Sequence, residues 1–111
     1  MELLRNIEKV RDTLSMKTIL KGRLALISSE FPEDEMRHLQ KFVLQQVNQD
    51  LLIVSSALQV LDLLIFQQEH CNTLLLTEED FQKALSLKEE LLTLHFALHN
   101  YSKKIEALLQ L

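Results

Sequence analysis

Turn-forming residues are almost absent from this chain, which contains one glycine, Gly22, and one proline, Pro32, in 111 residues. Average usage would give about eight glycines and five prolines. Because these two residues form many of the turns in proteins, few turns are expected, and the residues between them must form long elements. Leucine fills 26 positions while β-branched residues are sparse, a balance that favours helix over strand. We therefore predict an all-α fold, in one domain over residues 1–111.

The first predicted helix runs from about Glu2 to Ser28. Apolar residues recur at helical spacing in its first half, and a similar stripe continues after a phase shift near residues 15–18. A kink or a short break is expected at this phase shift. The first stripe consists of Leu3, Ile7, Val10 and Leu14.

The second predicted helix starts at Pro32, which suits the first helical position, and the acidic run Glu33–Glu35 favours the positive end of the helix dipole. No helix breaker appears before residues 70–73, so this helix covers about forty residues, or about 57 Å. Its weakest point is the polar run Asn48–Asp50. A turn there would give a four-helix bundle, which is the alternative to three helices.

The third predicted helix has the clearest start. Thr77 is a natural N-cap with Asp80 three residues later, and Leu76 can pack against Phe81 as a hydrophobic staple. Behind this start, apolar residues alternate at spacings of three and four, which is typical of coiled-coil packing. We therefore predict an antiparallel bundle of three long helices. The third-helix seam consists of Ala84, Leu87, Leu91, Leu94, Leu98, Tyr101, Ile105 and Leu108.

Residues 51–66, LLIVSSALQVLDLLIF, form the most apolar stretch of the chain. A membrane-spanning helix needs about 20 predominantly apolar residues, and this run ends sooner and contains Gln59 and Asp62. At 100° per residue both lie in one narrow polar stripe that continues along the second helix. We therefore expect no membrane span. Most of the helix circumference is expected to be buried, as in the central helix of a bundle.

Six apolar residues fall outside the stripes that a three-helix core would use. Two interrupt the polar stripe of the second helix, and four form a separate stripe on the third helix, about 150° from its seam. Such residues gain nothing from the bundle alone, so we expect them to contact another protein chain in a homo- or hetero-oligomer. The predicted partner-binding residues are Leu52, Phe66, Phe81, Leu85, Leu92 and Phe96.

The net charge of −4 divides unevenly, because residues 1–28 carry six basic and three acidic side chains and the remainder carries six and thirteen. The first helix, at +3, can therefore lie beside an acidic surface. A nucleic-acid site would need a denser basic patch with stacking aromatic residues, and a phosphate-binding loop would need more than one glycine. With Cys71 as the sole cysteine, no internal disulfide can form. We expect a cytoplasmic protein without nucleic acid or a small-molecule substrate.

Two short motifs resemble metal sites. His95 and His99 lie one turn apart, and Glu35 and His38 have the Glu-x-x-His spacing of carboxylate di-iron bundles. Neither motif has the further ligands in sequence that a metal site needs. We expect both histidines of the third helix to be structural, with no metal or other cofactor and no catalytic residue. Cys71 beside His70 is not expected to act as a nucleophile, because adjacent side chains near a helix end point apart.

The three-helix layout, with an acidic second helix and a capped third, resembles spectrin repeats and BAG co-chaperone domains over nearly the whole chain. The sequence departs from both patterns, since it has no tryptophan and its third helix presents leucine and phenylalanine. No functional residue is carried over. The predicted function is a non-enzymatic interaction module: an adaptor, an assembly or secretion-type chaperone, or a subunit of a larger complex. The alternatives are a homodimeric regulator and a metal-dependent enzyme that uses His95, His99 and Glu35.

Overall fold

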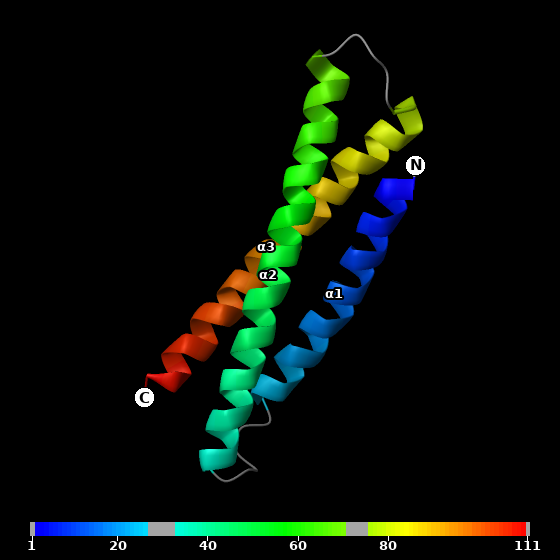
Figure 1. Cartoon of the computed structure of the whole chain (residues 1–111). Coiled ribbons are helices and arrows are strands. Elements are labelled where there is room, and N and C mark those ends of the chain that lie inside the picture. Colours follow the sequence, from blue (N-terminus) through cyan, green and yellow to red (C-terminus); the bar gives the residue numbers. More distant parts are fainter. Residues whose placement is uncertain (1, 27–32, 71–75, 111) are drawn as a thin grey trace.

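The bundle consists of three long helices that alternate in direction (Figure 1). The computed structural model describes residues 2–26, 33–70 and 76–110, with the side chains of 18–26 excepted. The helices are α1 (Glu2–Leu26), α2 (Glu33–His70) and α3 (Glu78–Leu109), and no strand occurs among the described residues. The Cα atoms span 60 × 21 × 16 Å. The predicted all-α, antiparallel three-helix bundle is confirmed.

α2 is a single helix, and the alternative of four helices is wrong. It continues through residues 48–50, where a turn would have divided it. Two of these polar residues serve interhelix packing instead: Asp50 is only 3% exposed, and the Ser102 hydroxyl of α3 donates to Asn48 Oδ1 at 3.1 Å. The first turn is acidic, as predicted, whereas Pro32 lies outside the described residues.

α1 differs from the prediction in two details. The helix continues through residues 15–18 without the expected break, and Ser28 lies outside the described residues. Leu4 is buried in place of Leu3, which is exposed, while Ile7 and Leu14 belong to the core as predicted. Either leucine fits helical spacing from Ile7, because residues three and four positions away lie on the same face.

The core lies mainly between α2 and α3, which make the most extensive interhelix contact, while α1 and α2 contact each other least. The α3 seam is buried as predicted from Ala84 to Leu98. Beyond Leu98, Ile105 is buried as predicted, but Ser102 is buried rather than Tyr101. A straight helix drifts by about 20° per heptad against a strict seven-residue repeat, which favours later positions towards the end of a long seam. For the same reason Leu108 is exposed.

The start of α3 is fixed by local hydrogen bonds. Thr77 is the N-cap, and its side-chain oxygen accepts from the Asp80 N–H at 3.1 Å, as the sequence predicts. Leu76, just before the cap, is buried, and both of its backbone polar groups bond the Gln68 side chain of α2, at 3.1 and 3.2 Å. The cap therefore also joins the end of α2 to the beginning of α3.

Thr77→Ala should destabilise the bundle by about 1 kcal/mol, because the Asp80 N–H loses its acceptor. Thermal melting followed by circular dichroism should show a melting temperature lower by several degrees. Thr93→Ala is the matched control, since the Thr93 hydroxyl bonds only the Glu89 carbonyl within its own helix. An equal decrease in melting temperature in both variants would show that loss of the helix cap does not cause the destabilisation.

Candidate functional site

Four of the six predicted partner-binding residues are exposed. Leu52, Phe66, Leu92 and Phe96 are between 49% and 70% exposed. Phe81 and Leu85 are half-buried and pack against the core, so part of their surface already serves the bundle. We call the surface formed by these six residues the α2–α3 face.

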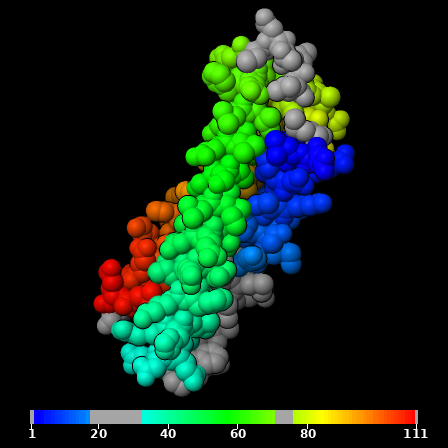
Figure 2. Space-filling model, in the orientation of Figure 1, coloured from blue at the N-terminus to red at the C-terminus, as the bar shows by residue number. Residues whose placement is uncertain are grey.

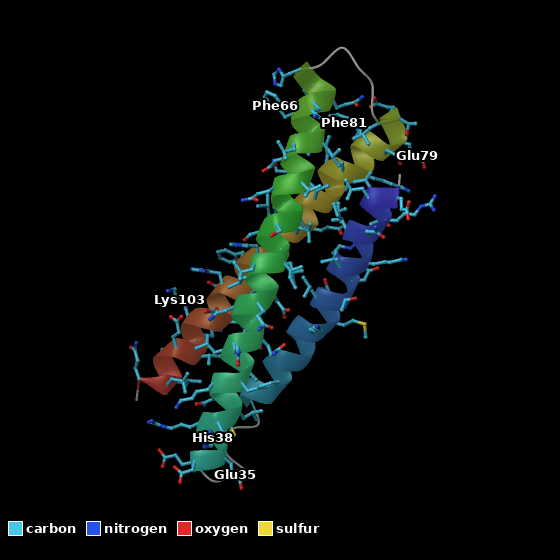
Figure 3. The ribbon with its side chains drawn as sticks, viewed as in Figure 1. Glu35, His38, Phe66, Glu79, Phe81 and Lys103 are labelled. Atoms are coloured by element: carbon cyan, nitrogen blue, oxygen red, sulfur yellow. The ribbon has the colours of Figure 1, made fainter. Side chains whose placement is uncertain are left out.

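The α2–α3 face lies along one side of the seam between α2 and α3. Asp62 Oδ1 and Lys88 Nζ form an ion pair at 2.7 Å across this seam. Phe66 lies one turn after Asp62, and Leu85 and Leu92 lie one turn to either side of Lys88, so they share a side with the pair. Figure 3 shows Phe66 on the side of α2 that points away from α1. The structure thus gathers Phe66 of α2 and Leu85 and Leu92 of α3 around one ion pair.

Sequence reasoning missed a second apolar surface, on the outer side of α2. Phe42, Ile53 and Leu63 are between 46% and 65% exposed. The expectation that most of the α2 circumference would be buried is therefore wrong. The physical reason is that α2 has only two neighbours, and Figure 2 shows neither of them covering its outer side. The sequence signal for this surface was the apolar arc of α2, which is too wide for two neighbouring helices to cover.

α2 also has the length and composition of a membrane-spanning helix. Core helices of soluble proteins pass the same test, but they are mostly buried, and only 28% of the most apolar window of α2 is buried in the bundle. The long apolar stretch of the sequence therefore retains much apolar surface that its own chain does not cover.

Charged contacts attach α1 to α3. The Arg11 guanidinium bonds Glu90 of α3 and its neighbour Asp12. Partial burial opposes the positive charge, but the hydrogen bonds and charges of these two carboxylates raise the pKa of Arg11 above its ordinary value. On α3, burial raises the pKa of the Tyr101 phenol, which lies at the edge of the core.

The residues of the two metal-like motifs do not come together. Glu35 lies in the first turn of α2, about 20 Å along the axis from Asn48, which contacts α3 one turn after His99. Figure 3 shows Glu35 and His38 at the same end of α2. Within residues 2–26, 33–70 and 76–110, no group of three histidine, cysteine or acidic residues could hold a metal ion. Cys71 lies outside these ranges.

The charged and polar contacts among the described residues lie within single helices, join two helices or cap the start of α3. The apolar surfaces of α2 and α3 are therefore the candidate functional site. Comparison of the chain with protein-family models, with curated proteins and with solved structures finds no match.

Proposed function

We propose that this chain is a non-enzymatic interaction module that binds another protein chain through the α2–α3 face. The observation that carries the proposal is the exposure of Leu52, Phe66, Leu92 and Phe96 in the isolated bundle. Soluble monomers rarely expose extended apolar patches, and those that do commonly use them to bind a partner. Burial of these side chains would remove apolar area from water at about 25 cal/mol per Å².

The α2–α3 face has the anatomy of a binding surface. Aromatic residues are enriched in the centres of protein interfaces, and this face contains three phenylalanines. The Phe66 ring contacts His70 with a centroid distance of 4.6 Å, which restricts the ring before any partner arrives. Restricting a side chain in advance lowers the entropy cost of binding.

An adaptor, an assembly or secretion-type chaperone and a subunit of a larger complex all fit this mode of binding. The proposal has the chain acting in the cytoplasm as part of a homo- or hetero-oligomer. It involves no membrane span, nucleic acid, small-molecule substrate, metal or other cofactor. A metal-dependent enzyme is not proposed, because Glu35 lies far from the histidines of α3 along the bundle axis.

The test compares Phe66→Ser and Leu92→Ser with Met16→Ser, a control on an exposed residue of α1. The first two variants should keep the wild-type melting temperature. They should weaken partner binding by about 1–2 kcal/mol each, or more at a hot spot, while the control binds normally. Sedimentation measures self-association, and pull-down with mass spectrometry identifies a different partner, whose affinity is then measured.

A large drop in melting temperature with association unchanged would refute this proposal. That outcome would mean that Phe66 and Leu92 stabilise the isolated fold rather than an interface.

A further inference from the structure

A groove opens between α1 and α2, the two helices that contact each other least. It has a volume of about 240 Å³ and is lined by Lys9, Val10, Thr13, Leu14, Lys17 and Ile53. We call it the α1–α2 groove. On the α2 wheel, Ile53 lies about 140° from Phe66 and about 100° from Leu52, so this groove and the α2–α3 face lie on different sides of α2.

The floor of the α1–α2 groove is apolar. Leu14 is buried and belongs to the core, Val10 is half-buried beside it, and Ile53 of α2 is 46% exposed. An apolar side chain inserted here would contact core residues on one side and Ile53 on the other. The groove therefore offers a bound side chain more apolar contact than an isolated exposed residue would.

The rim of the groove is cationic. Its charged lining residues are Lys9 and Lys17, both exposed, and none of the described side chains that line it is acidic. The two lysines are separated by about two helical turns, or about 12 Å along α1. Two cations around an apolar floor suit a ligand that has apolar side chains on one face and carboxylates beside them.

We infer that the α1–α2 groove binds an acidic amphipathic helix of a partner protein. A helix in a groove is anchored by apolar residues three and four positions apart, and its flanking glutamates or aspartates would face Lys9 and Lys17. This inference goes beyond the proposed function, because it adds a second surface and specifies the chemistry of its ligand.

The outer side of α2 in a second copy of this chain fits the groove less well. Its exposed apolar residues on the outer side of α2 are Phe42, Leu52, Ile53 and Leu63. The positions between them on that side are glutamine and serine: Gln45, Gln49, Ser56 and Gln59. That strip lacks the carboxylates that the two lysines would need, so charge complementarity disfavours it as the occupant.

The test uses two synthetic stapled helices of about 14 residues, or about four turns. Both carry leucines on one face, with glutamates beside them in one peptide and lysines in the other. Fluorescence anisotropy with the full chain should show saturable binding of the glutamate peptide that weakens with salt, and binding of the lysine peptide about ten-fold weaker or less.

Matched charge variants locate the peptide. Lys9→Glu with Lys17→Glu should weaken binding of the glutamate peptide by about ten-fold or more. Arg37→Glu with Lys104→Glu makes the same change in net charge on exposed residues elsewhere and should bind normally. Ile53→Ser should also weaken binding, and thermal melting of each variant confirms that it is folded.

Three results would overturn the inference. Equal losses in the two charge variants would mean that the peptide responds to net charge alone. Loss of peptide binding in Phe66→Ser or Leu92→Ser would place the peptide on the α2–α3 face. If these two variants still bind the peptide, the groove can be tested independently of the proposed function. If the wild-type chain is a dimer and the variant with Lys9→Glu and Lys17→Glu is a monomer, the occupant of the groove would be a second copy of the chain.

Discussion

Leu91→Ala should lower the free energy of unfolding by about 2–5 kcal/mol, the usual cost of removing a buried leucine side chain. Leu91 is 0% exposed and lies in the α3 seam that packs against α2. Truncation leaves a cavity that neighbouring helices fill only in part, so lost burial and lost contacts add together. Urea denaturation, followed by circular dichroism, measures the change.

The adjacent residue provides the control for this prediction. Leu92 is 49% exposed on the α2–α3 face, so Leu92→Ala should change the free energy of unfolding by less than about 1 kcal/mol. The slope of free energy against urea should stay the same in both variants. Equal destabilisation would mean that α3 is rotated from the described orientation, and the α2–α3 face would then not exist as a surface.

Val54→Asp should unfold the chain. Val54 of α2 is 0% exposed and belongs to the hydrophobic core. A carboxylate placed there has no water to solvate it. The expected cost exceeds about 4 kcal/mol, a large part of the roughly 5–15 kcal/mol that stabilises a typical domain. Loss of the cooperative thermal transition and rapid proteolysis would be the observed results.

Ile53→Asp is the matched variant on the outer side of α2. Ile53 is partly exposed, so the new carboxylate can remain hydrated and the bundle should keep its cooperative transition. The pair also tests whether α2 crosses a membrane, because an aspartate at the centre of a membrane helix costs about 2.5–3.5 kcal/mol on the insertion scale. Similar penalties at both positions would favour a membrane span over the bundle.

The two proposed binding surfaces share α2, which would allow a small bundle to contact more than one chain. The α2–α3 face and the α1–α2 groove lie on different sides of the same helix, and their variants can be tested independently. If both proposals hold, α2 is a central element that contributes to the core and to two binding surfaces.

Features that depend on neighbouring residues along the chain were predictable from the sequence. The scarcity of glycine and proline predicts few, long helices, and Thr77 predicts the start of α3 through a bond that spans three residues. The seam from Ala84 to Leu98 follows from helical periodicity alone. Local geometry determines each of these features, so they can be predicted without knowledge of the packing.

The candidate site was predictable only in part. Leu52, Phe66, Leu92 and Phe96 are exposed as their helical positions predict, because each lies away from the stripe that faces the core. Phe81 and Leu85 have a similar position on the wheel, yet they pack against the core. Angular position is a property of one helix, whereas burial also depends on how closely the neighbouring helix approaches.

The tertiary structure alone decided which residues turn inward where the pattern allows two choices. It buries Leu4 rather than Leu3, and Ser102 rather than Tyr101. It also carries α2 unbroken through Asp50 and leaves the outer side of that helix uncovered. These outcomes depend on the number and placement of the helices around α2. Helical periodicity determines the direction of each side chain, but only packing determines whether another helix lies in that direction.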